Sequence, residues 1–117
     1  MENPVVLVVD DENFIRENIA KFLNLNKINT FVACEGGEAL KIYQNNKIDL
    51  VLTDLNMPNG MDGFSLIKQI QKINPAQKII VMSGFVENEQ LIGEEYPFVQ
   101  KPFSSKDLVA KIKKILA

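Results

Sequence analysis

The apolar residues of this chain alternate between two spacings, and that alternation constrains the fold more than any other feature. Five strands are predicted by short apolar runs, at residues 5–9, 30–33, 50–53, 79–82 and 98–100. The segments between and after these runs place apolar residues at helical intervals, as in the set Ile15, Ile19, Phe22 and Leu23. Apolar strands that alternate with helices are typical of a parallel sheet covered on both faces. We therefore expect an α/β fold with a doubly wound sheet and right-handed crossovers.

A single domain should account for the whole chain, residues 1–117, because no linker or repeat divides it and its length suits one core. Asn24, Asn26 and Asn29 are expected to end the first helix. Ser104, with Asp107 three residues later, is expected to begin the last helix as its N-cap. Residues 87–96 have room for only a short fourth helix.

Composition excludes several classes of function. The formal net charge is −2, which argues against a nucleic-acid-binding surface. The sequence has neither the roughly 20 apolar residues of a membrane helix nor the features of a signal peptide, so we expect a cytoplasmic protein without a membrane segment. Because the chain has no histidine, histidine bases, histidine metal ligands and Cys–His nucleophiles are excluded. The one cysteine, Cys34, is expected to be a small structural residue.

Polar side chains follow four of the five predicted strands. The carboxyl ends of parallel strands meet at one edge of a sheet, where binding sites form in this class of fold. The residues expected at that edge are Asp10, Asp11, Asp54, Ser83 and Lys101. The second strand delivers Cys34 and Glu35, to which we assign no function. Each of these residues alone is ordinary turn or helix-cap chemistry, and only their shared edge indicates a site.

The chemistry of this set indicates phosphoryl transfer. Three neighbouring carboxylates without a cation would raise one another's pKa, whereas Mg²⁺ favours a few carboxylates together with waters and phosphate oxygens. A carboxylate can also attack a phosphoryl donor as a nucleophile. A lysine ammonium can then hold a phosphoryl oxygen as a point charge. Positioning and charge neutralisation of this kind account for most of the catalysis of phosphoryl transfer.

Five motifs, taken in order, resemble those of the receiver domain of bacterial response regulators, the CheY-like proteins. They are VVDDE (8–12), LVLTDLNMP (50–58), MDGFSLI (61–67), IIVMSG (79–84) and FVQKPF (98–103), and together they span nearly the whole chain. The resemblance implies a flavodoxin-like (βα)5 sandwich whose five parallel strands follow the order 2-1-3-4-5. It also implies a role in two-component signalling or a phosphorelay.

The resemblance assigns roles to the residues that match the family's motifs. Asp54 corresponds to the phosphoacceptor, and Lys101 to the lysine that binds the phosphoryl group. Asp10 and Asp11 correspond to the acidic pair that binds Mg²⁺ or Mn²⁺, directly or through water. Asp54 and the main-chain carbonyl of Asn56 would complete the protein's ligands to that metal.

The resemblance also implies a switch. Ser83 corresponds to the hydroxyl that moves toward the phosphoryl group, and Phe98 to the aromatic switch position. Phe98 has no hydroxyl where tyrosine is frequent, so an ordinary core phenylalanine is the alternative. Lys101 would precede a cis peptide bond at Pro102. Phe85, two residues after Ser83, is expected to limit the access of water to the acyl phosphate.

Two departures from the family's pattern lie near the expected site. Gly60 adds one residue to the loop beside Asp54, which we expect to alter access for a partner and to leave the acidic pocket intact. The segment between Ser83 and Lys101 is short for the family. The fourth helix, which usually belongs to the signalling face, must therefore be brief or irregular.

These implications favour a phosphorylation switch over two alternatives. The expected donor is a sensor histidine kinase or a histidine phosphotransfer protein. The expected output is a downstream protein bound through the face of helix 4, strand 5 and helix 5, so the domain is a signalling module and not a conventional enzyme. SGF and YPFVQKPFS resemble receivers fused to hybrid histidine kinases, although a stand-alone protein is equally compatible. The alternatives are a phosphorylation-independent interaction module on the same fold, and a metal-dependent hydrolase or nuclease.

Overall fold

The structure is a computed structural model that describes residues 2–84 and 96–117. Its strands are β1 (Val5–Val9), β2 (Asn29–Ala33), β3 (Leu50–Asp54), β4 (Lys78–Ser83) and β5 (Phe98–Gln100). Its helices are α1 (Asn13–Leu25), α2 (Gly36–Asn45), α3 (Gly63–Ile73) and α5 (Ser105–Leu116). The fourth helix expected at residues 87–96 lies outside the described residues, except for Tyr96, which forms a bend.

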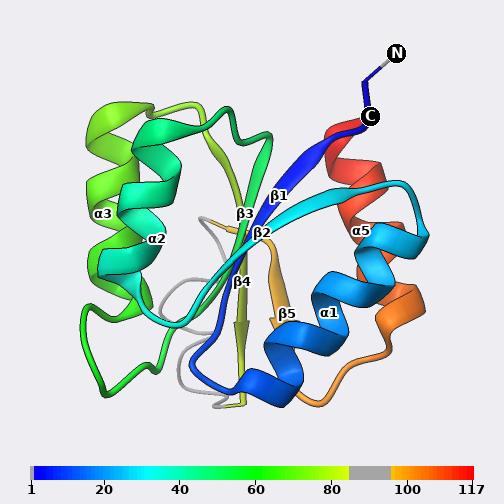
Figure 1. Ribbon diagram of the computed structural model, residues 1–117, viewed down its shortest axis with the longest axis horizontal. Coiled ribbons are helices and arrows are strands. Elements are labelled where there is room, and N and C mark those ends of the chain that lie inside the picture. The colour runs from blue at the N-terminus through cyan, green and yellow to red at the C-terminus, as the bar shows by residue number, and fades with distance from the viewer. Residues whose placement is uncertain (1, 85–95) are drawn as a thin grey trace.

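The five strands form one parallel sheet in the order β2-β1-β3-β4-β5, as the family resemblance implied. In this register Val8 of β1 lies between Val32 of β2 and Leu52 of β3. Figure 1 shows α2 and α3 together on one face of the sheet and α1 and α5 on the other. The fold is therefore the expected doubly wound sandwich. Among the described helices, none has the length and apolar character that a membrane span requires.

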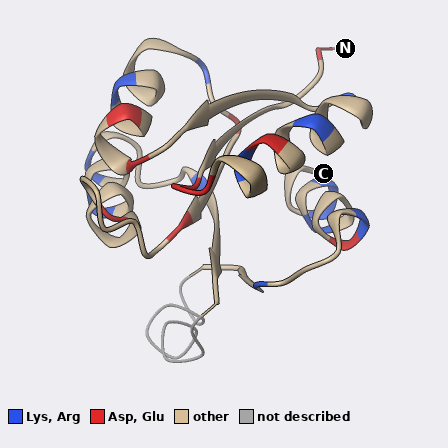
Figure 2. Ribbon diagram, turned by 60° about the horizontal axis from the view of Figure 1, so that its bottom comes forward, with Lys and Arg blue, Asp and Glu red and all other residues tan. Residues whose placement is uncertain are grey.

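Each face of the sheet has its own apolar core, which explains why the central strands are unbroken apolar runs. Leu7 and Val9 of β1 pack into the cluster that contains the buried residues of α2 and α3. Val6 and Val8 point the other way, into the cluster that contains Leu108 and other residues of α1 and α5. A strand buried on both faces needs an apolar residue at every position. Acidic and basic residues are interspersed over the outer helices (Figure 2).

The edge strand β2 is the exception to this burial. Phe31 and Val32 are 38% and 40% exposed, whereas every residue of β3 is buried. β2 pairs only with β1 among the described strands, and its outer side is open. Its mixed polar and apolar sequence is what an edge position allows.

The ends of the elements differ slightly from the prediction. Asn24 does not end the first helix: α1 continues to Leu25, and Asn26 is its C-cap, with its side chain donating to the carbonyl oxygen of Phe22 at 2.9 Å. Asn29 is the first residue of β2. Asn24 is exposed, and an exposed asparagine destabilises a helix only slightly, so α1 continues past it. Ser104 is confirmed as the N-cap of α5, where its hydroxyl accepts from the main-chain N–H of Asp107 at 3.4 Å.

Two strands extend one residue further toward the carboxyl edge than predicted. β3 includes Asp54, which pairs with Met82, and β4 includes Ser83, which pairs with Gln100. Both polar residues are therefore held by the sheet itself and not by a loop, which fixes the direction of their side chains.

Candidate functional site

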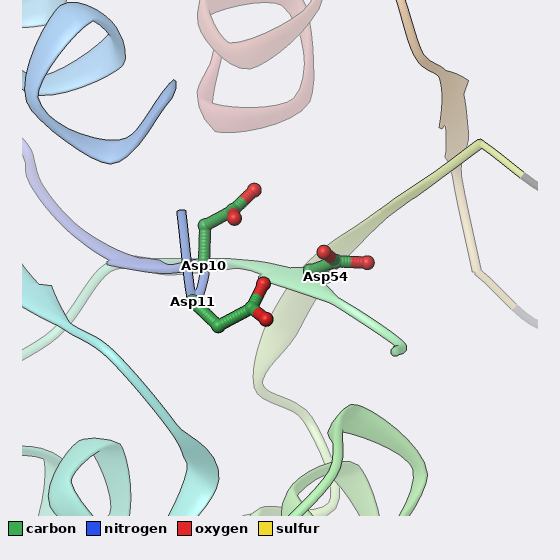
Figure 3. A group of neighbouring side chains, drawn as sticks. All are labelled: Asp10, Asp11 and Asp54. Carbon is green, nitrogen blue, oxygen red and sulfur yellow. The ribbon is translucent and has the colours of Figure 1, made fainter. Parts of the chain in front are cut away.

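The carboxyl edge of the sheet brings together three carboxylates from two central strands. Asp10 and Asp11 directly follow β1, and Asp54 is the last residue of β3 (Figure 3). Each contributes one oxygen to a group in which all three oxygens lie within 4.8 Å of one another. The topology predicted this meeting, because β1 and β3 are neighbours in the sheet.

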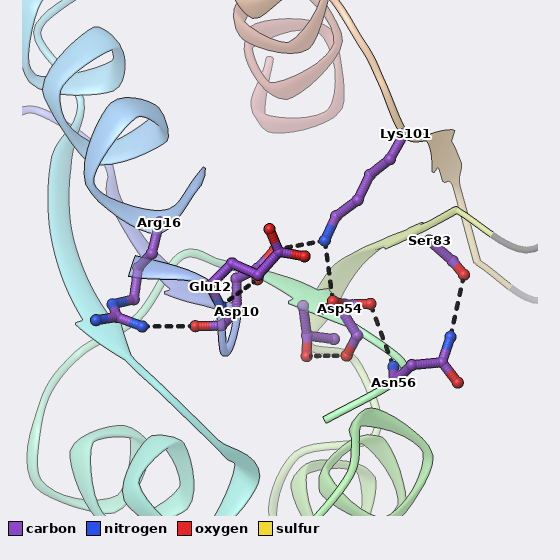
Figure 4. A network of polar contacts seen from close by, with 8 residues as sticks. Asp10, Glu12, Arg16, Asp54, Asn56, Ser83 and Lys101 are labelled. Atoms are coloured by element: carbon purple, nitrogen blue, oxygen red, sulfur yellow. Dashed lines mark hydrogen bonds and ion pairs between the residues drawn. The ribbon is translucent and has the colours of Figure 1, made fainter. Parts of the chain in front are cut away.

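Asp10 is fully buried, and three contacts satisfy its carboxylate and its main-chain carbonyl (Figure 4). Its Oδ2 pairs with the Nζ of Lys101 at 2.6 Å. Its Oδ1 accepts from the main-chain N–H of Glu12 at 2.9 Å, and its carbonyl oxygen accepts from Nη1 of Arg16 at 2.8 Å. These contacts fix both the carboxylate and the turn that carries Asp11.

Asp54 is also buried, and the same lysine reaches it. Its Oδ2 lies 2.9 Å from the Nζ of Lys101, and its Oδ1 accepts from the main-chain N–H of Asn56 at 3.2 Å. Burial raises the pKa of the Asp54 carboxyl above its usual value, with the negative charge of Asp10 adding to the effect, although hydrogen bonding and charge attraction from Lys101 oppose it. The carboxylate is thus destabilised relative to one in water.

Lys101 directly follows β5, and its ammonium contacts the carboxylates of both Asp10 and Asp54. Burial alone would lower the pKa of its ammonium, but hydrogen bonds and attraction from Asp10 and Asp54 outweigh burial and raise that pKa above its usual value. Its main-chain N–H donates to the carbonyl oxygen of Ser83 at 2.9 Å, which continues the pairing of β4 with β5. The Lys101–Pro102 peptide bond is cis, as the resemblance implied.

Asn56 contributes a contact that the sequence did not predict. Its side-chain Nδ2 donates to Oγ of Ser83 at 3.4 Å, so the loop after β3 reaches the end of β4 (Figure 4). The resemblance implied only a role for its main-chain carbonyl as a metal ligand. The sequence could not predict this contact, because the direction of a side chain two residues after a strand depends on the path of the loop.

The first turn of α3 packs directly on the strand end that carries Asp54. The N–H of Gly63 donates to the carbonyl oxygen of Leu55 at 3.2 Å, and the Asp62 side chain caps the helix by accepting from the N–H of Ser65 at 2.9 Å. A Cβ on Gly63 would lie 2.8 Å from Cα of Leu55 and closer still to the carbonyl oxygen of Asp54. Glycine is therefore required where this helix meets the sheet.

The remaining predicted residues lie around this centre. Phe98 begins β5, is half-buried, and packs against the cluster beneath α2 and α3. Its carbonyl oxygen accepts from Nζ of Lys111 at 2.8 Å. Phe85 lies outside the described residues. Cys34, expected to be a small structural residue, is a free cysteine exposed at the surface.

Two further residues were missed by the sequence-based reasoning. Arg16, the only arginine of the chain, holds the main chain of Asp10, and its spacing from Asp10 offered no recognisable motif. Glu35 was assigned no function, yet it is the N-cap of α2 and accepts from the N–H of Glu38 at 2.6 Å. Glutamate is not a favoured N-cap residue, so the usual cap signal was absent.

The donor set of this site fits a hard divalent cation. Its three carboxylates supply only oxygen atoms, which Mg²⁺ and Mn²⁺ prefer. Asp11 is half-buried and faces the same space as Asp10 and Asp54 (Figure 3). Lys101 already neutralises part of this charge, which shows that the arrangement accommodates a positive group between the carboxylates.

The chain is similar in sequence to several curated proteins. Sporulation initiation phosphotransferase F of Bacillus subtilis is 32% identical, and the match covers 99% of this chain and 96% of that protein. Sensor kinase CckA of Brucella abortus is 33% identical over 95% of this chain but only 12% of its own length. The probable transcriptional regulator ycf27 of Cyanidium caldarium is 36% identical over 95% of this chain and 45% of its own length. The chain thus spans less than half the length of several relatives that it matches.

Solved structures agree in fold as well as in sequence. The receiver domain of Francisella response regulator 1452 has a TM-score of 0.87 and 33% identity, with 97% of each chain covered. The chemotaxis protein CheY4 of Vibrio cholerae has a TM-score of 0.88 and 25% identity, with 97% of this chain and 98% of that chain covered. The response regulator receiver domain family matches residues 6–113. On this sequence match, this fold and this carboxyl-edge site, the chain belongs to the CheY-like receiver domains of two-component signalling.

Proposed function

We propose that Asp54 accepts a phosphoryl group from a phosphohistidine donor in a Mg²⁺-dependent reaction. The observation that carries this proposal is the meeting of three carboxylates with one ammonium that reaches two of them. A receiver domain is a signalling domain and generally not a conventional enzyme, and the chain's own contribution is to position the reacting groups. The competing hypothesis is a phosphorylation-independent interaction module on the same fold.

The proposed metal ligands are Asp10, Asp11, Asp54 and the main-chain carbonyl of Asn56. A bound Mg²⁺ or Mn²⁺ would supply charge neutralisation to the phosphoryl oxygens and to the attacking carboxylate. Arg16 and the N–H of Glu12 fix the Asp10 end of this set, and the N–H of Asn56 orients Asp54. These contacts support a site that is organised before a donor arrives.

The proposed reaction forms one bond and breaks one bond. A carboxylate oxygen of Asp54 attacks the phosphorus, the bond from phosphorus to the donor's imidazole nitrogen breaks, and the imidazole retains the bonding electron pair. Lys101, whose pKa is raised by its two carboxylate partners, remains an ammonium and pairs with an oxygen of the transferred group. Burial of Asp54 raises its pKa and leaves its carboxylate less well solvated, which favours its reaction as a nucleophile.

The switch is the second part of the proposal. Ser83 is buried at the end of β4, and its hydroxyl would move toward the new phosphoryl group, with Phe98 responding on β5. The proposed output face comprises β5, α5 and the residues of the expected fourth helix, which lie outside the described part of the chain. A downstream protein bound there would read the phosphorylated state.

The proposed partners are a sensor histidine kinase or a histidine phosphotransfer protein as donor. Relatives that include sensor kinases support this assignment, because their matching segments are receiver-like parts of longer proteins. Direct binding of nucleic acid is not part of the proposal, since the net charge is −2. A cytoplasmic location, expected from the sequence, belongs to the proposal as well.

The proposal is tested by intact-protein mass spectrometry after incubation with acetyl phosphate and Mg²⁺. Wild type should gain the mass of one phosphoryl group, and the gain should disappear when Mg²⁺ is chelated or when Asp54 is changed by Asp54→Ala. Failure of wild type to gain mass would favour the interaction module. A gain that survives Asp54→Ala would place the phosphoacceptor elsewhere.

A further inference from the structure

The loop at residues 55–62 joins the phosphoacceptor strand to α3 and carries Asn56. The N–H of Asn56 contacts Asp54, and its side chain contacts Ser83. Pro58, Asn59 and Gly60 at the outer part of the loop are exposed. Leu55 and Met57, on either side of Asn56, are buried in the core beneath α2 and α3, so it is the outer part of the loop that needs further contacts to hold it against the fold.

One attachment of the loop is a main-chain contact with the start of α2. The N–H of Gly36 donates to the carbonyl oxygen of Met61 at 2.8 Å. A Cβ on Gly36 would lie 2.7 Å from that oxygen and 2.8 Å from Cγ of Met61. The first turn of α2 and the loop are thus packed so closely that only glycine fits between them.

A further attachment of the outer loop is the carboxylate of Glu35, which lies between two glycines. A Cβ on Gly37 would lie 2.6 Å from Oε1 of Glu35. A Cβ on Gly60 would lie 2.8 Å from Cδ of the same side chain and closer still to Oε2. Gly60 also has a φ of 125°, in the region that favours glycine. Gly60, the extra residue of this loop, therefore lies against the Glu35 side chain at a position where a larger residue would overlap it.

The same carboxylate accepts from the N–H of Glu38 at 2.6 Å and so caps α2. One side chain thus contacts both the first turn of α2 and the outer part of the loop. A serine or aspartate would cap the helix as well or better, but neither is as long as glutamate. Capping alone does not explain the length of Glu35, whereas contact with Gly60 does.

We propose that Glu35 is a positioning residue for the phosphoacceptor loop. By holding Gly60 against the start of α2, it fixes the loop and, through it, the main chain of Asn56, and this sets the affinity of the site for Mg²⁺. The effect on Mg²⁺ rests on the proposed function, in which the Asn56 carbonyl is a ligand. The effect on the loop itself does not depend on that function.

The experiment compares two substitutions that separate capping from positioning. Glu35→Ser keeps a favoured N-cap and removes the reach to Gly60. Glu35→Gln keeps the length and the accepting oxygen and removes only the charge. Val109→Ala, on the buried face of α5, serves as a control for a general loss of stability. The readouts are amide hydrogen exchange of residues 56–62 without metal, and the Mg²⁺ dissociation constant from the dependence of the melting temperature on Mg²⁺ concentration.

Glu35→Ser should speed exchange across residues 56–62 and weaken Mg²⁺ binding several-fold, less than the roughly tenfold or more that follows the loss of a direct contact to a metal ligand. Glu35→Gln and Val109→Ala should leave both quantities close to wild type. Unchanged exchange in Glu35→Ser would overturn the proposal, because Glu35 would then be only a cap. An equal effect in Glu35→Gln would also overturn it, because charge and not contact would be responsible.

The two readouts also separate this inference from the proposed function. If wild type does not bind Mg²⁺ at all, the proposed function fails, and the exchange measurement still decides whether Glu35 holds the loop. If Mg²⁺ binds and only exchange responds to Glu35→Ser, the loop is positioned by Glu35 but the stated effect on the metal site is refuted.

A double-mutant cycle with Gly60→Ala gives an independent check. The strain of an alanine at a φ of 125° is the same in both backgrounds and cancels in the cycle. The remaining coupling reports the collision of the new methyl group with Glu35. Gly60→Ala should therefore destabilise the protein less in the Glu35→Ser background than in wild type. Additive effects in urea denaturation would show that the two residues do not interact and would overturn the proposal.

Discussion

Lys101 is the residue on which the charge balance of the site depends. Its ammonium lies 2.6 Å from an oxygen of Asp10 and 2.9 Å from an oxygen of Asp54, and both carboxylates are buried. Buried charges are tolerated only when they are paired and hydrogen-bonded. Without a metal ion, therefore, this one side chain compensates two carboxylates that would otherwise repel each other.

Removing this ammonium should be costly unless a cation replaces it. We expect Lys101→Met to lower the free energy of unfolding by about 3 kcal/mol at neutral pH, because it leaves buried carboxylates unpaired. Added Mg²⁺ should restore part of the loss, so the stabilisation by Mg²⁺ should be larger in the variant than in wild type. Urea denaturation with Mg²⁺ or with EDTA measures both effects. A variant as stable as wild type in EDTA would show that Lys101 does not compensate these charges.

The pH dependence of stability should reveal that burial destabilises the ionised carboxylate of Asp54. Because burial raises its folded-state pKa above the usual 3.8, the folded protein holds this proton more tightly than the unfolded chain does. The resulting contribution to the free energy of unfolding is complete below the usual pKa, and it is lost as the pH rises through the raised pKa of the folded state. Asp54→Asn, which does not titrate, should therefore be more stable than wild type at neutral pH in EDTA.

The difference between Asp54→Asn and wild type should shrink as the pH falls toward about 4. Urea denaturation of both proteins at several pH values, with metal chelated, gives this comparison. A difference that stays constant with pH would mean that the Asp54 carboxyl does not titrate in this window, and that burial does not raise its pKa.

At the scale of the elements, the site depends on how closely helices approach the carboxyl edge of the sheet. The start of α3 lies against β3 through Gly63, and the start of α2 lies against the loop through Gly36. Both contacts involve main-chain atoms, which cannot rotate away as a side chain can. The helices are therefore placed by glycines at their first residues as much as by their apolar faces.

Gly63→Ala should destabilise the protein by about 2 kcal/mol, because the new methyl group would overlap the main chain of β3. Gly84→Ala is the matched control, since a Cβ at Gly84 would meet no atom of the described residues within 4 Å. Urea denaturation should place the control within about 0.5 kcal/mol of wild type. Equal effects of the two substitutions would refute the close packing of α3 on β3.

At the scale of the whole molecule, the proposed metal site should link metal concentration to global stability. A ligand that binds only the folded state stabilises it by RT ln(1 + [L]/Kd), about 2.7 kcal/mol at a hundredfold excess over Kd. Mg²⁺ should therefore raise the melting temperature of wild type. Asp11→Ala should abolish this rise and the Mg²⁺-dependent phosphorylation, while the stability in EDTA stays within about 0.5 kcal/mol of wild type.

Calorimetry or dye-based thermal denaturation across a Mg²⁺ series tests this expectation. Asp11 suits the test because it belongs to the acidic group but is less buried than Asp10 and Asp54. If Asp11→Ala responds to Mg²⁺ as wild type does, the proposed ligand set is wrong.

The sequence pattern predicted a doubly wound parallel sheet and a set of polar residues at its carboxyl edge for a physical reason, whereas the strand order came from the family resemblance. Both faces of the sheet are covered, so period and composition identify the strands, and a parallel topology then brings Asp10, Asp54 and Lys101 to one edge. The contacts of Arg16, Glu35 and the Asn56 side chain could not be predicted in this way. They depend on rotamers and on loop paths, for which the sequence contains no periodic signal.

The ion pair between Asp10 and Lys101 joins residues that are 91 positions apart. Neither partner can find the other until the strands between them have assembled, because closing so long a segment is entropically unfavourable without the sheet. On a ribosome, Asp10, Asp11 and Asp54 emerge well before Lys101 does. A nascent chain consequently carries the acidic residues without their counter-ion, and the site becomes complete only when the last strand has joined the sheet.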